Sequence, residues 1–226
     1  MIIWLASYPR SGNTFFRVAL RYLYGCKPNC IYQMGGEGTG SLGVLDCKVA
    51  TDLSIEELEA DEEIHFVKTH DLWQPQYRRA IYLLRDGREA LVSYAHFLQS
   101  RFNHQVDKPE FETGLRNLIL EENSPFGTWS SNVASWEQCP QMTLVRFEDF
   151  TKRPLACLDE ALKNLGVSID RVSADVPPFQ ELHQLAPDFF RKGRVGEWQD
   201  EFPADLLDLF HEKSREQLVR YGYLSE

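Results

Sequence analysis

Short apolar and β-branched runs alternate along the chain with longer helix-like stretches. The short runs predict strands at 2–7 (IIWLAS), 64–70 (IHFVKTH), 80–86 (AIYLLRD) and 143–149 (TLVRFED). The longer stretches predict helices at 14–24, 87–98, 110–121, 129–138, 154–165 and 204–221. This alternation favours βαβ units, and therefore an α/β fold with a mostly parallel central sheet flanked by helices.

We expect a single domain over residues 1–226, because 226 residues suffice for one sizeable core. The chain contains no internal repeat, low-complexity tail or linker that indicates a second domain. Two irregular stretches stand out by composition, the flexible loop 34–43 (MGGEGTGSLG) and the segment DVPPF that starts at Asp175.

The charge balance limits the possible partners. With 43% hydrophobic and 26% charged residues, the chain is typical of a soluble globular protein. Its net charge of -10 argues against general nucleic-acid binding, which depends on excess Lys and Arg. Residues 1–7 are apolar but lack a basic leader and are too short to span a membrane. We expect a cytoplasmic protein in which any anion-binding site is confined to a small part of the acidic chain.

Cysteine content gives no sign of a disulfide framework. The 5 cysteines are odd in number and scattered, which favours reduced thiols. Cys26 and Cys30 could form part of a metal site with Cys47, but a fourth ligand is missing nearby. We expect no bound metal.

Each predicted strand ends in polar or charged residues, where open α/β sheets bind ligands. The first strand leads into YPRSGNT, which differs from the loop that binds nucleoside triphosphates: Ser7 replaces its first Gly and Asn13 its Lys. Thr14 is kept, and the cation has moved to Arg10. A strand, loop and helix in this order suit an anion at the helix N-terminus. An ordinary turn with a Ser or Asn cap is the alternative.

The second strand ends in FVKTH, where Lys68 and His70 are two positions apart and would share a face. Because a nearby cation disfavours the imidazolium, His70 is a candidate general base near neutral pH. A solvated lysine and a surface histidine are the simpler explanation.

Two further segments carry cations suited to phosphate. Arg85 and Ser93 lie in LLRDGREALVSY, where a strand meets a helix, although Arg85 could simply pair with Asp86 or Glu89 on the surface. FFRKGRVGEW is the densest basic run, with Arg191 and Lys192 beside Gly193. Cationic segments at several strand ends of an acidic chain indicate an anionic ligand.

Together these segments resemble the sulfotransferases that use 3′-phosphoadenosine-5′-phosphosulfate (PAPS), especially the cytosolic branch that sulfates small molecules. YPRSGNTFF resembles the 5′-phosphosulfate loop of that family, VKTH its catalytic segment, LLRDGREALVSYAHF its 3′-phosphate segment and FFRKGRVGEW its late basic loop. SPFGTWSSNVASW and VRFEDF also resemble family segments, so the likeness runs over nearly the whole chain in order.

The resemblance implies the sulfotransferase fold, which is similar to that of P-loop kinases, and a site for PAPS and its product 3′-phosphoadenosine-5′-phosphate (PAP). Its catalytic residues would be His70 as general base, with Lys68 and Arg10 at the transferred group. The implied cofactor-binding residues are Arg10, Ser11, Gly12, Asn13, Thr14 and Phe15 in the first loop and helix, Arg85 and Ser93 with Arg191, Lys192 and Gly193 for the 3′-phosphate, and Phe147 and Phe179 beside adenine.

The chain also departs from the family pattern. Lys is common where Arg10 stands, and Trp where Phe15 stands. The stretch QDEFPADLLD lacks the pattern of the family's small dimer contact, so the oligomeric state is left open. The acceptor pocket comes from variable segments, and the acceptor is left open beyond a small molecule with a hydroxyl or an amine.

The implied reaction is in-line transfer of a sulfuryl group to the acceptor, with no metal. One alternative is an ATP-dependent P-loop phosphotransferase, against which Asn13 at the lysine position argues. The other is a catalytically inactive nucleotide-binding module.

Overall fold

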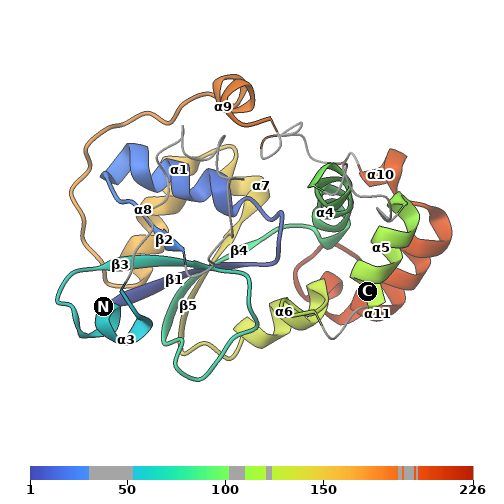
Figure 1. The fold of residues 1–226 in the computed structure, drawn as a ribbon, viewed down its shortest axis with the longest axis horizontal. Coiled ribbons are helices and arrows are strands. Elements are labelled where there is room, and N and C mark those ends of the chain that lie inside the picture. The colour runs from blue at the N-terminus through green and yellow to red at the C-terminus, as the bar shows by residue number, and fades with distance from the viewer. Residues whose placement is uncertain are drawn as a thin grey trace.

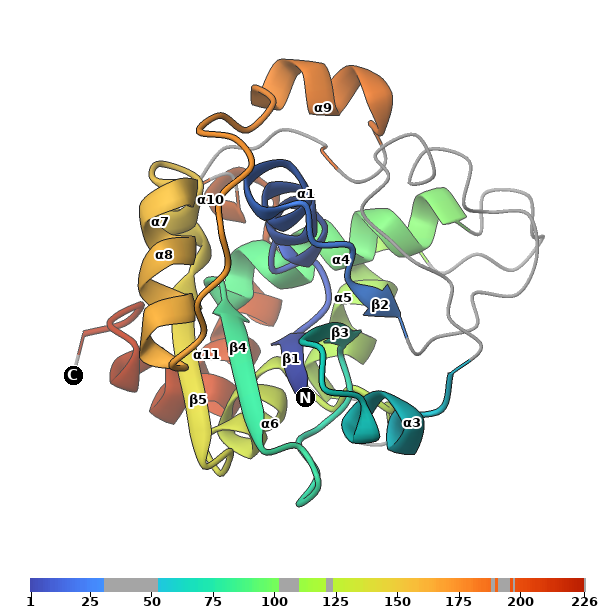
Figure 2. The ribbon, with the colours of Figure 1, turned by 90° about the vertical axis from the view of Figure 1, so that its left-hand side faces the viewer.

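A parallel sheet with strand order β2-β3-β1-β4-β5 forms the centre of the computed structural model, which describes residues 1–30, 53–101, 110–120, 124–187, 190, 196 and 198–225 (Figures 1 and 2). The strands are β1 (Ile2–Ser7), β2 (Asn29–Cys30), β3 (His65–Thr69), β4 (Arg79–Leu84) and β5 (Gln141–Arg146). All of these strand pairings are parallel. The predicted α/β fold with a mostly parallel sheet is therefore confirmed.

Helices lie between most consecutive strands, and further helices follow the last strand, β5. They are α1 (Asn13–Tyr24), α3 (Ile55–Ala60), α4 (Gly87–Arg101), α5 (Phe111–Leu120), α6 (Trp129–Trp136), α7 (Phe147–Phe150), α8 (Pro154–Asn164), α9 (Phe179–Leu185), α10 (Trp198–Glu201) and α11 (Ala204–Arg220). Every predicted helix is present, with ends shifted by at most three residues.

Helices cover both faces of the sheet, and the alternation of side chains along β1 explains how (Figure 2). Ile3 and Leu5 pack with apolar residues of α1 and α8 on one face. Trp4 and Ala6 pack with apolar residues of α4, α6 and α11 on the other. All six residues of β1 are buried, as expected for a parallel strand with helices on both faces.

The prediction of a strand over 143–149 is wrong at its end. β5 stops at Arg146, and the next four residues form the helical turn α7. A turn puts Phe147 and Phe150, three positions apart, on one side, whereas a strand would do so only for positions two apart. Both rings then reach the first loop and α1: Phe147 lies against Gly12, and Phe150 lies 5.0 Å from Phe16. Tertiary packing overrides the β-propensity of this segment.

Several short elements were not predicted: β2, α3, α9 and α10. The helix α3 has a sequence signal in retrospect, a capping box in which Ser54 and Glu57 bond each other's backbone N–H. Residues 175–178 are irregular as expected, and Phe179 begins α9. The glycine-rich loop 34–43 lies outside the described residues.

Two further observations concern membranes and metals. In the part of the chain that the structure describes, no helix combines the length and apolar character needed to cross a bilayer. Cys26, Cys139 and Cys157 are free thiols. The same part holds no group of three potential metal ligands, and Cys47 falls outside it.

Gly87 lets the start of α4 lie close to Trp129 of α6 and Phe210 of α11. A Cβ at this position would lie 2.5 Å from Phe210 Cζ and 2.6 Å from Trp129 Cδ2. Both rings are about 1% exposed, so neither has room to move aside. The close approach sets the position of Arg85 and Asp86, which immediately precede the helix.

Replacing Gly87 with Ala should therefore destabilise the fold by about 1–3 kcal/mol, the usual cost of overpacking a core. Gly114→Ala in α5 is the matched control, because a Cβ there would meet nothing within 4 Å. Relief of the glycine's backbone entropy should make that variant more stable by about 0.5–1 kcal/mol. Urea unfolding of both variants measures the difference, and equal stabilities would contradict the packing account.

Candidate functional site

Three strand ends meet at the carboxyl edge of the sheet. In the parallel register Ala6 of β1 lies opposite Thr69 of β3, and Ser7 lies opposite Leu83 of β4. The chain leaves β1 for α1 on one face and leaves β4 for α4 on the other. The strand order reverses between β1 and β4, and ligands of open α/β sheets bind at such a point.

The first loop (residues 8–12) leads from β1 into α1. Gly12 is the N-cap of α1 with φ 91°, a left-handed conformation that favours glycine. A Cβ here would come within 2.4 Å of Phe147 Cδ2. Ser11 is 1% exposed, and its buried hydroxyl has no hydrogen-bond partner among the described residues. A buried hydroxyl beside the amides of a helix N-terminus is suited to an anion.

Arg10 connects this loop to α4. It is the described non-glycine residue with a positive φ, at 66°, a conformation that costs energy for a side chain with a Cβ. Its Nε donates to the Ser93 hydroxyl at 3.3 Å, and its carbonyl accepts from Arg85 Nη1 at 3.0 Å. Its guanidinium also lies 4.9 Å from the ring centre of Phe97. The structure thus brings Arg10, Ser93 and Arg85 together.

Asn13 faces the sheet. Its Nδ2 donates to the Leu5 carbonyl at 3.0 Å and to the Ser7 hydroxyl at 3.3 Å, and the residue is 5% exposed. Of its polar groups, the backbone N–H is therefore the one suited to a ligand at the helix N-terminus. The side chain instead fixes the start of α1 to β1.

His70 follows the end of β3 and contacts β1. Its Nδ1 lies 2.7 Å from the Ser7 carbonyl oxygen and 3.2 Å from the Ser7 hydroxyl. A carbonyl can only accept, so Nδ1 carries the proton of the neutral ring and Nε2 keeps its lone pair. Asn132 of α6 donates to the His70 carbonyl at 2.9 Å and fixes the backbone. Sequence and geometry together give a histidine with one defined basic nitrogen.

The surroundings of His70 disfavour its protonated form. Burial among protein atoms lowers its pKa well below 6.5, and the positive charges of Lys68, Arg17 and Arg10 lower it further. The hydrogen bond to Ser7 acts in the opposite direction but is outweighed. Lys68 is itself 9% exposed, on the β3 face that carries Phe66 and packs toward α1. The His70 imidazole is therefore neutral at neutral pH.

Arg17 of α1 is a candidate site residue that the sequence analysis missed. It is 3% exposed, its Nη2 lies 3.4 Å from the Thr14 hydroxyl one turn earlier, and its charge acts on His70. A cation near a helix N-terminus opposes the helix dipole. An arginine in the first turns of the helix after a phosphate-like loop is therefore a signal that sequence reading can use.

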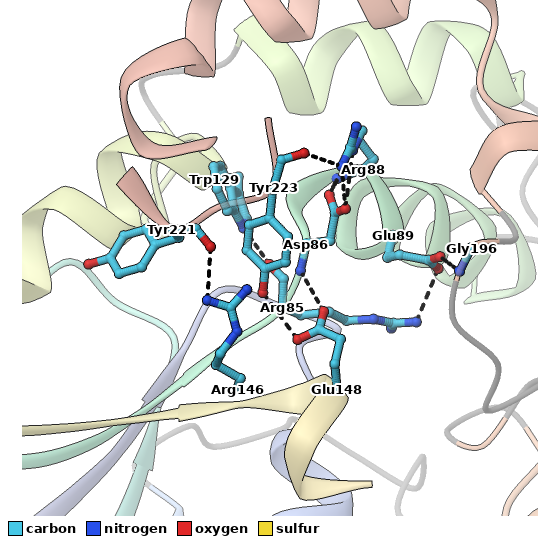
Figure 3. A network of polar contacts seen from close by, with 10 residues as sticks. All are labelled: Arg85, Asp86, Arg88, Glu89, Trp129, Arg146, Glu148, Gly196, Tyr221 and Tyr223. Atoms are coloured by element: carbon cyan, nitrogen blue, oxygen red, sulfur yellow. Dashed lines mark hydrogen bonds and ion pairs between the residues drawn. The ribbon is translucent and has the colours of Figure 1, made fainter. Parts of the chain in front are cut away.

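Arg85 is held on several sides at the end of β4 (Figure 3). Its Nη2 lies 3.3 Å from Glu89 Oε2, with both side chains largely buried. Its guanidinium stacks 4.4 Å from the ring centre of Phe147. The other Glu89 oxygen accepts a short bond from the Gly196 N–H. Glu89, which the sequence analysis considered only as a surface partner of Arg85, also ties Arg85 to the end of the late basic segment.

The aromatic residues predicted beside adenine belong to three different helices: Phe15 to α1, Phe147 to α7 and Phe179 to α9. Phe15 packs edge to face against Phe150 and Phe190, with ring centres 5.0 and 6.3 Å apart. Phe147 lies beneath Gly12 and Arg85. Phe179 is the first residue of α9, which packs against Val18 of α1 through Leu182. The predicted contacts of Arg191, Lys192 and Gly193 fall outside the described residues.

Comparison with known proteins identifies a family. The family model of the sulfotransferase domain matches residues 2–222 of this chain. Over 252 aligned residues the chain is 24% identical to sulfotransferase 1E1 from Mus musculus, covering 95% of this chain and 82% of that protein.

Solved structures share the fold. The mouse sulfotransferase SULT7A1 complexed with PAP aligns with a TM-score of 0.65 at 19% identity, over 98% of this chain and 88% of that one. Retinol dehydratase in a complex with retinol and PAP aligns with a TM-score of 0.62 at 18% identity, over 96% and 81%. The predicted sulfotransferase fold is confirmed.

The environment of His70 predicts its titration. We expect an imidazole pKa well below 6.5, because burial and neighbouring cations disfavour the charged ring. Lys68→Met should raise that pKa without restoring 6.5, since burial is the larger cause. NMR titration of the imidazole signals, with His70→Gln for assignment and the exposed Lys152→Met as control, measures both. A pKa at or above 6.5 in the unmodified protein would contradict this electrostatic account.

Proposed function

The chain belongs to the sulfotransferase domain family, and we propose that it transfers a sulfuryl group from PAPS to a hydroxyl of a small molecule, with an amine as the other candidate acceptor. The observation that carries this proposal is the geometry of His70. A neutral imidazole with its proton on Nδ1 and its lone pair on Nε2 stands at the strand end next to the first loop. A general base for a hydroxyl needs this protonation state.

The residues of the first loop fit the donor. PAPS would supply an activated sulfuryl group joined to a 5′-phosphate. The buried Ser11 hydroxyl, the Gly12, Asn13 and Thr14 amides and Arg10 offer donors and charge for its oxygens. The side chain of Asn13 bonds β1, so the proposal uses its amide alone.

His70 would take the acceptor proton at Nε2, while the Ser7 carbonyl holds Nδ1–H and keeps the ring in one orientation. Lys68 and Arg10 would stabilise the negative charge that develops on the phosphate side as the sulfur–oxygen bond breaks. Fixed charges in a water-poor site usually provide the largest share of catalysis. Arg17, buried beside Thr14, would add to the same positive field.

The second phosphate would bind at the end of β4. Arg85 and Ser93 are connected to each other through Arg10, and the Arg85 fork is suited to two phosphate oxygens. Arg191, Lys192 and the Gly193 amide complete this proposed group. Adenine would lie near Phe15, Phe147 and Phe179. PAP in the structures of SULT7A1 and retinol dehydratase supports a donor with two phosphates on adenosine.

A small acceptor and a cytoplasmic location belong to the same proposal. Retinol in the retinol dehydratase complex supports a small organic acceptor. The free thiols of Cys26, Cys139 and Cys157 support a reducing compartment. No step of the reaction as proposed here uses a metal.

Two other functions make different predictions. A P-loop phosphotransferase would need magnesium-dependent ATP binding through a lysine at position 13, where the chain has an asparagine bonded to β1. An inactive nucleotide-binding module would not need a histidine with a depressed pKa and a defined tautomer. Neither alternative uses the pairing of Ser7 with His70.

Substitution of His70 by Ala should lower turnover by about a hundredfold or more, the contribution of a positioned general base, while nucleotide binding persists. Transfer from labelled PAPS to a panel of phenols, alcohols, amines and sugars measures the rate. His65→Ala is a matched control at the opposite end of β3 and should keep its turnover. Near-normal turnover in His70→Ala would remove His70 from its role; no transfer to any acceptor by the unmodified protein would contradict the function.

A further inference from the structure

A closed ring of hydrogen bonds joins the C-terminal turn to the residue after Arg85 (Figure 3). Its members are Asp86, Arg88, Glu148 and Tyr223, which we call the C-terminal latch. The Tyr223 hydroxyl donates to Glu148 Oε2 at 3.1 Å, and Glu148 Oε1 accepts from the Asp86 N–H at 3.1 Å. Arg88 Nη2 bonds Asp86 Oδ2 at 2.7 Å and the Tyr223 carbonyl at 2.8 Å. Tyr223 therefore holds both the backbone and the side chain of Asp86.

The latch is largely shielded from water. The side chains of Arg88 and Asp86 are 11% and 10% exposed, and the guanidinium of Arg146 lies 4.6 Å from the ring centre of Tyr223. Burial and the charge of Glu148 raise the pKa of Tyr223 far above its usual value, so its hydroxyl stays protonated and donates. Hydrogen bonds to charged groups are the stronger ones, and more so out of water.

The latch lies next to the proposed 3′-phosphate site in sequence and in space. Asp86 follows Arg85 directly, and the Arg85 carbonyl accepts from Trp129 Nε1 at 3.1 Å. The Arg85 side chain bonds Glu89 and the Arg10 carbonyl. The backbone is held separately, by Trp129 at the Arg85 carbonyl and by Glu148 at the N–H of the next residue. A fork that must meet two phosphate oxygens depends on the direction in which its backbone points it.

We propose that Tyr223 and Glu148 are positioning residues for Arg85, so that the C-terminal turn, more than 130 residues away in sequence, sets the affinity of the site for a 3′-phosphate. This inference rests on the proposed function, which assigns that phosphate to Arg85. A latch that served only to attach the C-terminus would alter stability alone. A positioning latch alters the difference between ligands with and without the 3′-phosphate.

The same turn offers a matched control. The Tyr221 hydroxyl donates to Glu137 Oε1 at 2.9 Å, beside the end of α6. Tyr221→Phe thus removes a tyrosine–glutamate bond of the same kind from the same turn without touching Asp86. Tyr223→Phe removes the bond to Glu148 and leaves the Tyr223 carbonyl for Arg88.

Calorimetric dissociation constants for PAP and for adenosine 5′-phosphate, which lacks the 3′-phosphate, test the proposal. The unmodified protein should prefer PAP, and Arg85→Ala should lose that preference. Tyr223→Phe should weaken PAP binding about three- to tenfold with little change for adenosine 5′-phosphate, as expected for coupled neighbours. It should have no further effect on PAP binding when combined with Arg85→Ala. Tyr221→Phe should bind both nucleotides normally.

Each contrary result has a distinct meaning. No preference for PAP in the unmodified protein, or a preference kept by Arg85→Ala, would overturn the proposed 3′-phosphate site. If Arg85→Ala behaves as expected, unchanged PAP binding by Tyr223→Phe would overturn the latch. Equal weakening of both nucleotides by Tyr223→Phe would also overturn the latch, and so would the same loss of PAP binding in Tyr221→Phe. Either result would mean that the substitution lowers stability in general and does not change the position of Arg85.

Discussion

The parallel pairing of β1 with both β3 and β4 is the constraint on which every contact of the site depends. It sets Ser7 beside the end of β3 on one side and the end of β4 on the other. Ser7 can therefore bond His70, while the loop that follows it reaches Arg85 through the Arg10 carbonyl. A shift of one residue in either pairing would turn these side chains to the opposite face of the sheet.

Positive charge gathers around this edge although the chain as a whole is acidic. Arg10, Arg17 and Lys68 all disfavour protonation of His70, and two of them are almost fully buried. Holding cations close together costs stability unless anions compensate. The positive potential of these cations would attract an anionic donor and would also keep His70 neutral. Binding and base strength thus have one electrostatic origin.

The sequence predicted the α/β class and the order of the major elements, because burial on both faces leaves strong apolar runs. It also predicted that Arg10, His70 and Arg85 would lie at strand ends, and the strand order then makes these ends neighbours. It did not use the position of Arg17 in the first turns of α1, and it missed Glu148, because the contacts of Glu148 with Asp86 and Tyr223 join distant segments that no local pattern encodes. The helical turn α7 was missed for the same reason: the packing of Phe147 against Gly12 decides it.

The central claim is that the site formed by the first loop and the end of β4 accepts adenosine with separate 5′ and 3′ anionic groups and not a nucleoside triphosphate. A thermal unfolding series with PAP, ATP and ATP with magnesium tests this most directly. We expect PAP at a hundredfold excess over its dissociation constant to raise the melting temperature by about 5–10 °C. ATP, with or without magnesium, should raise it much less. Stabilisation by magnesium-bound ATP that equals or exceeds that by PAP would contradict the account.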